Sequence, residues 1–256
     1  MTWLLAQIVE VPTDPNELFD FPSLLEGFFI NRTAILVSLA AVLAFLLLWL
    51  PFRRPRIVPT KFQVVVESLH GFVVNSIGRD VIGPESHKYE WLLVPMFFWI
   101  LIMNLFEVTP GINYPPTSRM AIPLLLAVFV WIVFIFVGLK KHGFRYITAT
   151  LIPPGVPKAL LILVIPIEFI SVFIIRPVSL AVRLFANMVA GHIMLTVFFL
   201  TTAAYFVLGP KLIGWIIPFS FSVVLVGFEV FVAVLQAFIF TLLTAVYIES
   251  SIYVEH

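Results

Sequence analysis

The chain has 256 residues, of which 61% are hydrophobic and 11% are charged, and its formal net charge at pH 7 is +1. Soluble domains are about 45–50% apolar and about 25% charged, so this composition predicts a membrane protein. The small net charge and the lack of a clustered basic face argue against a nucleic-acid partner, and the absence of cysteine excludes thiolate metal sites and cysteine nucleophiles.

The first predicted elements are an acidic arm and one membrane span. All five acidic side chains that precede the first apolar run lie within residues 1–33, which we expect to form an external arm. Residues 34–50 are apolar and long enough for a first span. Because FRRPR follows this span, the positive-inside rule places that end in the cytoplasm and the N-terminus outside.

Residues 62–82 and 91–139 are the next predicted elements. The first mixes apolar and charged residues, as is typical of an amphipathic helix that lies on a membrane surface. The second contains two apolar runs, residues 91–108 and 121–139, and the turn-rich VTPGINYPPTSR between them predicts a helical hairpin with an external loop. KKHGFR then forms a second basic loop on the cytoplasmic side.

Residues 158–250 are predicted to form the two longest helices. The run 158–207 would measure about 75 Å as a straight helix, more than twice a hydrocarbon core of about 30 Å. It is either two crossings or one steeply tilted helix, and the last apolar run is also too long for an upright span. The expected fold is a single all-α membrane domain over residues 1–256, with about five membrane helices and one surface helix. The last two helices are expected to be long, tilted and paired as an antiparallel hairpin.

Ionisable side chains within the apolar runs are the candidate functional residues. Each charge at membrane depth costs about 2.5–3.5 kcal/mol unless it is paired or faces water, so a function is the default explanation. The set comprises Glu107, Glu168, Arg176, Arg183, His192 and Glu229, with Gln236 as a neutral polar companion. Arg176 has a packing alternative, since it can pair with Glu168 or extend to the membrane interface. Glu107 can equally be an acid at the membrane interface. His192 can be a buried histidine whose ring nitrogens are hydrogen-bonded within the core.

The spacing in RLFANMVAGH places its polar residues on two sides of one helix. Arg183 and Asn187 are four residues apart and share a face. Small residues let another helix approach such a face closely. Those on or beside this face are Ser179, Ala186, Ala190 and Gly191. His192 projects to the opposite side, so it is expected to serve a different place.

An antiparallel hairpin of the last two helices predicts which polar residues meet. Pairing Arg183 with Gln236, or His192 with Glu229, places the turn at nearly the same point, Gly209–Pro210. Glycine and proline together are a strong turn signal. Two polar pairs therefore agree with one turn.

RPVSLAVRLFANMVAGHIML and LQAFIFTLLTAVYIESS together resemble the a subunit of the rotary, F-type ATP synthase membrane sector, and the resemblance covers essentially the whole chain. In that family an invariant arginine lies on a long tilted helix and faces the rotating c-ring. By this resemblance Arg183 is that arginine, and Asn187 and Gln236 match its polar companions. His192 and Glu229 stand where many bacterial members have Glu and His, so the pair is exchanged here.

The resemblance implies a stator subunit that is not an enzyme by itself. Two aqueous half-channels would carry protons to and from the c-ring carboxylates and so couple ion flow to rotation. The residues implied for them are Glu107, His192 and Glu229 on the outer side, and Glu168 and Ser179 on the inner side. Arg183 would stand between the two as a barrier, because it stays protonated, and its charge lowers the proton affinity of a nearby carboxylate. Glu168 is shifted by one residue from the acid that the family has before its arginine.

The implied partners are the c-subunit ring, the peripheral-stalk b subunits, the rest of the ATP synthase, the lipid bilayer and the translocated proton, with no cofactor or metal. The expected location is a bacterial plasma membrane, with the N-terminus outside and the C-terminus cytoplasmic; the alternative is the mitochondrial inner membrane. The alternative functions are a stand-alone ion channel or a secondary transporter, which predicts pseudo-symmetric halves that the sequence lacks. An intramembrane enzyme would need a motif such as HExxH, which is also missing. The sequence does not decide whether the transported ion is a proton or a sodium ion.

Overall fold

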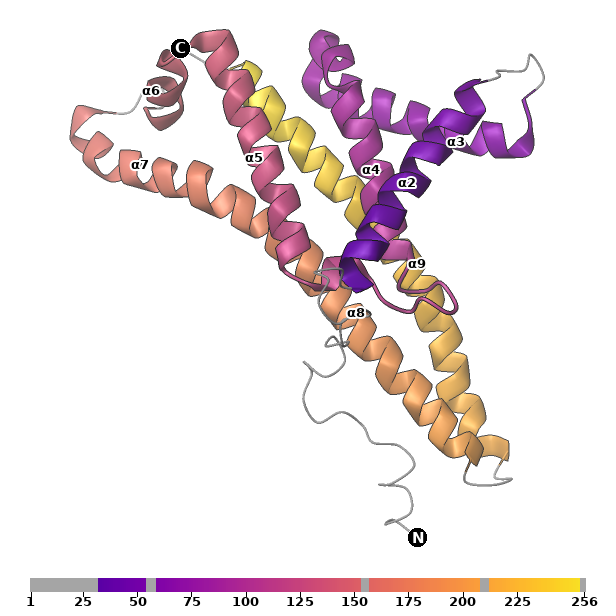
Figure 1. Cartoon of the computed structure of the whole chain (residues 1–256). Coiled ribbons are helices and arrows are strands. Elements are labelled where there is room, and N and C mark those ends of the chain that lie inside the picture. The colour runs from indigo at the N-terminus through magenta and orange to yellow at the C-terminus, as the bar shows by residue number, and fades with distance from the viewer. Residues whose placement is uncertain (1–31, 54–58, 153–156, 208–211, 254–256) are drawn as a thin grey trace, which may run out of the picture.

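The computed structural model describes residues 32–53, 59–152, 157–207 and 212–253, and these residues form helices and loops without any strand. The prediction of an all-α membrane protein is confirmed (Figure 1). The acidic arm predicted for residues 1–33 lies almost wholly outside the described residues. The first elements are α2 (Arg32–Arg53), α3 (Lys61–Phe72), the π-helix η2 (Val73–Ile82), the 3-10 helix η3 (Gly83–Lys88), α4 (Glu90–Leu105) and the 3-10 turn η4 (Pro116–Ser118). They are followed by α5 (Ala121–His142), α6 (Arg145–Leu151), α7 (Lys158–Ile170), the π-helix η5 (Ser171–Ile175), α8 (Arg176–Val207) and α9 (Leu212–Ile252).

In the described part of the chain, four helical stretches are long and apolar enough to cross a membrane. They are Arg32–Pro51, Ala121–His142, Leu160–Ala203 and Ile216–Ile252. The apolar helix α4 is shorter, and it ends three residues before the predicted limit of residue 108. It ends there because the chain turns back on itself, and the Thr109 hydroxyl donates a 2.8 Å hydrogen bond to the carbonyl of Leu105 in the last turn.

The amphipathic segment begins at a capped helix end and packs inward along one side. The side chain of Thr60 accepts a hydrogen bond from the backbone N–H of Gln63. This bond satisfies one of the backbone N–H groups that have no partner within the first turn of a helix. From there α3 and η2 run without a break to Ile82, close to the predicted range 62–82. Val73 and Ile77 are fully buried, and η2 packs against α9.

α7, η5 and α8 follow one another as one uninterrupted helical stretch of residues 158–207 (Figure 1). Of the two possibilities left by the sequence, the structure therefore has one long helix and not two crossings. At about 1.5 Å per residue it is much longer than a hydrocarbon core of about 30 Å, so it must lie strongly tilted.

α8 and α9 run antiparallel and make the most extensive interface of the fold (Figure 1). The buried stripe of α8 repeats at alternating spacings of three and four residues, as expected for one helix face. It consists of Ala181, Leu184, Met188, Gly191 and Leu195. α9 presents Ala233 and Ala237 in return, and such small residues allow close helix packing.

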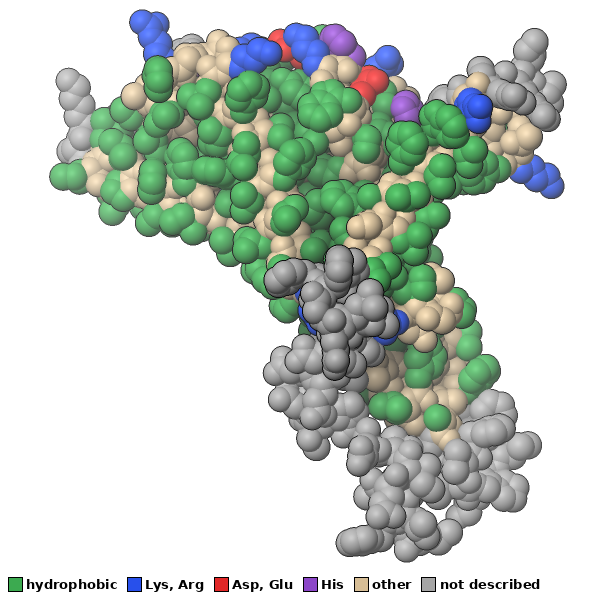
Figure 2. Space-filling view, in the orientation of Figure 1, with side chains coloured by type: hydrophobic (Ala, Val, Ile, Leu, Met, Phe, Trp, Pro, Cys, Tyr) green, Lys and Arg blue, Asp and Glu red, His purple; other side chains and the backbone are tan. Residues whose placement is uncertain are grey.

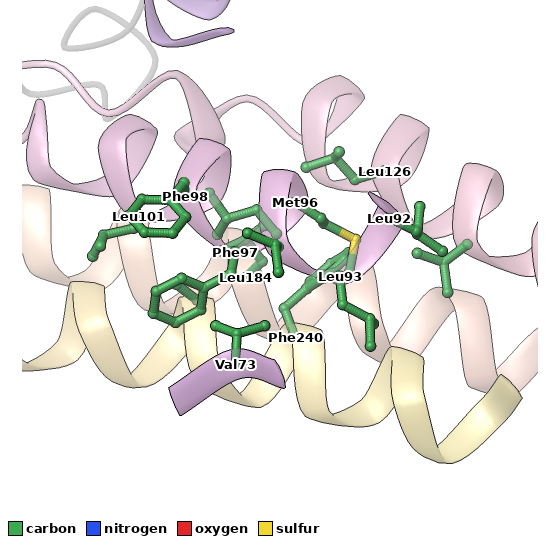
Figure 3. Close-up of a cluster of buried hydrophobic side chains, with 14 of the residues drawn as sticks. Val73, Leu92, Leu93, Met96, Phe97, Phe98, Leu101, Leu126, Leu184 and Phe240 are labelled. Carbon is green, nitrogen blue, oxygen red and sulfur yellow. The ribbon is translucent and has the colours of Figure 1, made fainter. Parts of the chain in front are cut away.

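α4 occupies the centre of the core because it is apolar on all sides. Figure 3 shows its side chains, among them Leu93, Met96 and Phe97, meeting Val73 of η2, Leu184 of α8 and Phe240 of α9. Both α4 and α5 pack against α9, which thus links them. This arrangement fixes the position of α8 and α9, where the candidate site lies.

Candidate functional site

The outward face of α8 carries Arg183 among small side chains. Arg183, Ala186 and Ala190 are exposed, and Asn187 is half-buried between them. Among the described residues, Arg183 has no hydrogen-bond or ion-pair partner. Gly191, which the sequence placed on or beside this face, is instead buried against α9. The outward face therefore presents a lone guanidinium that a group from outside the chain can approach.

Gln236 lies on the neighbouring helix, buried within the hairpin. Its exposed fraction is 5%, whereas Arg183 is exposed, and no hydrogen bond joins the two side chains. The structure thus places both residues in the α8–α9 pair without a direct link between them.

The register of the hairpin follows from a close contact between Gly191 and Glu229. A Cβ atom added at Gly191 would lie 2.5 Å from Oε2 of Glu229, so the carboxyl group rests on the glycine backbone. The predicted partner of Glu229 was His192, the next residue along α8, and this pairing stays a prediction. Near the predicted turn, the hydroxyl groups of Thr202 and Ser222 lie 3.4 Å apart. The turn itself, predicted at Gly209–Pro210, lies outside the described residues.

Arg176, at the start of α8, contacts α9 at the end of the hairpin opposite the predicted turn. Its guanidinium donates a 3.5 Å hydrogen bond to Ser250 Oγ and lies 5.4 Å from the ring centroid of Tyr247, both on α9. This position favours the packing interpretation of Arg176. The pairing with Glu168 that the sequence also allowed does not occur.

Glu107, in the turn after α4, and Glu229 of α9 form a pair of buried acids, and His192 of α8 follows Gly191, the residue that Glu229 contacts. Glu107 and Glu229 are 4% and 3% exposed, and their carboxyl groups are close enough to interact electrostatically. Glu107 Oε1 and Glu229 Oε2 have no hydrogen-bond partner among the described residues. Buried polar atoms are almost always paired with protein or water, so two unpaired carboxyl oxygens indicate a place for water or a proton.

A buried tyrosine next to this cluster was missed by the sequence reasoning. The hydroxyl of Tyr114 accepts a 3.1 Å hydrogen bond from Arg119 Nε and lies 3.1 Å from Thr33 Oγ1. Its ring meets the ring of His192 edge to face, with the centroids 6.5 Å apart, and Arg32 Cζ lies 5.5 Å from the tyrosine ring centroid. The signal in the sequence that could have indicated Tyr114 was the run of turn residues around it, which forces the chain back between the helices.

Asn104 and Thr117 were also missed, although both are buried beside the same loop. Thr117 Oγ1 donates a 2.9 Å hydrogen bond to Asn104 Oδ1, while Asn104 Nδ2 lacks a partner in the described residues. An asparagine in the apolar run of α4 was the signal, because an amide at that depth needs a partner.

Glu168 and Ser179 lie apart from this cluster, and both are half-buried. Glu168 is on α7, and Ser179 is in the first turn of α8, on the Arg176 side of Arg183. Neither has a side-chain hydrogen bond or ion pair among the residues described. In the same part of the chain, no three His, Asp or Glu side chains come together as a metal site would require.

Comparison with known proteins identifies similar chains over nearly the full length. Residues 34–249 match the family described as ATP synthase A chain. The ATP synthase subunit a of Frankia alni is 39% identical over 222 residues, which cover 86% of this chain and 76% of that protein. Those of Rhodococcus erythropolis and Magnetococcus marinus are 38% and 37% identical, and the matches cover 84% and 85% of those proteins.

Proposed function

Because the chain belongs to the ATP synthase A chain family, we propose that it is the stator subunit that carries protons to and from the carboxylates of a c-subunit ring, coupling ion flow to rotation. The observation that carries this proposal is the exposed Arg183, which has no partner among the described residues. An unpaired cation on an apolar helix is costly unless another chain supplies its counter-charge.

Arg183 acts as a barrier and as an electrostatic release group. A carboxylate that approaches it is favoured in its ionised form, so its proton leaves as it comes near. The guanidinium itself stays protonated and cannot pass the proton onward. Ala186 and Ala190 leave room for a partner helix to pass close to the arginine. Asn187 and Gln236 are the polar companions of the arginine on the two helices.

Glu107, His192 and Glu229 form the outer half-channel. The support is that Glu107 and Glu229 are buried and close enough to interact electrostatically, and that each keeps one carboxyl oxygen without a partner among the described residues. Glu229 also rests on Gly191, the residue before His192. Imidazole and carboxyl groups exchange protons readily near neutral pH, and water fills the places that protein groups leave open.

Glu168 and Ser179 belong to the inner half-channel, on the other side of Arg183. Both lack partners in the described part of the chain, which leaves their oxygen atoms available to water. The proton then leaves toward the end of the molecule where the basic side chains gather.

The same basic end gives the orientation in the membrane. Figure 2 shows most charged and histidine side chains along the top edge of the molecule, above a largely hydrophobic body. By the positive-inside rule this edge is cytoplasmic, which supports a cytoplasmic C-terminus and an external N-terminus. The membrane that we propose is a bacterial plasma membrane. There the chain is held by the peripheral-stalk b subunits and the rest of the ATP synthase.

Replacement of the arginine tests this function. In inverted membrane vesicles, Arg183→Ala should abolish ATP-driven acidification, followed with a pH-sensitive dye, while the complex still assembles on a native gel. The matched control is Arg145→Ala, at an exposed arginine of α6 outside the hairpin, which should pump normally. Intact coupled pumping by Arg183→Ala would show that the barrier role is wrong.

A further inference from the structure

A groove runs between α4 and α5 and ends in a cluster of lysines. Its inner part is an apolar space of about 320 Å³ between α2, α4 and α5. Its outer part is a space of about 710 Å³ between the start of α4 and the end of α5. Trp91 lines both spaces, so the two lie next to each other.

α5 contributes a stripe of side chains to the wall of this groove, with Ile132, Val137 and Lys141 beside it. Alternating spacings of three and four residues place the members of the stripe on one helix face. They are Leu126, Phe129, Val133, Phe136 and Lys140. From Leu126 to Phe136 the helix rises about 15 Å, which is half of a hydrocarbon core of about 30 Å. The apolar wall thus has the length of one membrane leaflet, and Lys140 stands where the head groups begin.

α4 and α5 both pack against α9, and the groove lies between these two helices. Its walls expose large apolar surfaces: Trp91 is 66% exposed and Phe136 is 63% exposed. Tyr89 and Trp91 lie together at the mouth, and these two residue types favour the membrane interface.

The mouth of the groove carries an excess of positive charge. Lys88, Lys140 and Lys141 line it, together with a single acid, Glu85. Glu85 binds Lys141 at 2.8 Å and Lys88 at 3.2 Å, and these bonds hold the pKa of its carboxyl group below the ordinary value. Lys140 has no ion-pair partner among the described residues. One carboxylate therefore faces three ammonium groups.

We propose that this groove binds one anionic phospholipid, with its phosphate at Lys88, Lys140 and Lys141 and one acyl chain along α5 beside Trp91. The lysines supply the charge complement of a phosphate group, and the stripe supplies an apolar wall one leaflet long. Basic pockets between membrane helices on the cytoplasmic side are a general form of lipid head-group site.

The charge at the mouth of the groove favours a lipid over a partner helix. The three lysines complement an anionic head group better than they do the apolar surface of a membrane helix.

Photolabelling tests this proposal on the intact ATP synthase complex. The complex is reconstituted in phosphatidylcholine vesicles that contain a trace of phosphatidylglycerol with a diazirine in its acyl chain. After illumination, mass spectrometry should find labelled peptides that contain residues 91–99 and 126–136. The same probe with a phosphatidylcholine head group should label these peptides several-fold less.

Charge variants give the matched comparison. Each lysine near an anionic head group contributes about fivefold in binding, so the double variant Lys88→Gln/Lys140→Gln should lose most of the phosphatidylglycerol labelling. Lys61→Gln, at an exposed lysine outside the groove, should leave it unchanged. Equal labelling by both probes, unchanged labelling of the double variant, or cross-links from residues 129 and 136 to a partner's helix in place of lipid would each overturn the proposal. The expected lipid labelling does not depend on the proposed proton path, so the two proposals are tested separately.

Discussion

The carboxyl group of Glu229 rests on the backbone of Gly191, where a Cβ atom would stand 2.5 Å from one carboxyl oxygen and 2.7 Å from the other. This contact joins α8 and α9 near the middle of the hairpin and leaves Glu229 only 3% exposed. The next residue of α8, His192, meets the ring of Tyr114. A glycine at this position is therefore part of the geometry of the proposed outer half-channel.

Gly191→Ala tests that geometry directly. The added methyl group should push the carboxyl group away, because no Cβ atom fits at 2.5 Å. The displaced atoms are the far end of a flexible side chain, so the stability of the complex should change little while proton pumping falls markedly. ATP-driven acidification of inverted vesicles measures the loss.

Two further variants separate a local effect from a general one. Gly227→Ala, on α9, should pump normally, because a Cβ atom there has no other atom within 4 Å. Gly191→Ala/Glu229→Asp should recover part of the activity, since the shorter acid leaves room for the methyl group. Normal pumping by Gly191→Ala alone would show that the contact does not matter for transport.

His192 and Glu229 should be partly exchangeable. In the proposed outer half-channel, His192→Glu alone adds a third carboxyl group to those of Glu107 and Glu229, and like charges disfavour ionisation of one another. The double variant His192→Glu/Glu229→His keeps one imidazole and two carboxyl groups. It should therefore pump faster than either single variant in the vesicle assay. A double variant no better than the poorer single variant would contradict a shared role.

Gly138→Ala should destabilise the packing of α6 against α5. A Cβ atom at Gly138 would lie 2.5 Å from the ring of Tyr146, and the Tyr146 hydroxyl is held 2.9 Å from Ser251 Oγ. Because the ring cannot easily move, we expect a loss of about 1–3 kcal/mol, typical of overpacking. Thermal unfolding of the purified complex should show a lower Tm. Gly71→Ala is the control, since its Cβ would meet Asn75 at an ordinary 3.8 Å, and an equal Tm for both variants would refute the steric argument.

Glu85→Gln should change the stability in a pH-dependent way. The hydrogen bonds from Lys141 and Lys88 lower the pKa of Glu85 from its ordinary value of 4.5 in the folded protein. A lowered folded-state pKa stabilises the fold above the ordinary pKa, and this contribution is lost as the pH falls through the lowered value. At pH 7 the variant should thus melt at a slightly lower temperature than the parent, because exposed ion pairs contribute little.

The same comparison of Tm values below about pH 4.5 should show the difference shrinking, because the carboxyl group becomes protonated first in the unfolded chain and then, at its lowered pKa, in the folded chain as well. Glu90→Gln, at an acid with no ion pair in the described part, should show no such trend. A difference that stays constant down to pH 3 would mean that the two lysines do not stabilise the ionised Glu85.

Features that depend on neighbouring positions in the chain were predictable from the sequence. The length of the apolar runs gave an all-α membrane protein, because the backbone in hydrocarbon must satisfy its own hydrogen bonds. The four-residue spacing of Arg183 and Asn187 placed both on one side of α8, where the structure has them exposed or half-exposed. Helix periodicity is a local property, so one sequence suffices to read it.

Contacts between distant segments were decided only by the tertiary structure. The pairing of His192 with Glu229 stays a prediction, and only packing could show that the Glu229 carboxyl group lies on Gly191. Tyr114 touches Thr33, which is 81 residues away, and nothing in its local sequence indicates that partner. Such contacts depend on how helices share volume and satisfy buried polar groups, which is a property of the whole fold.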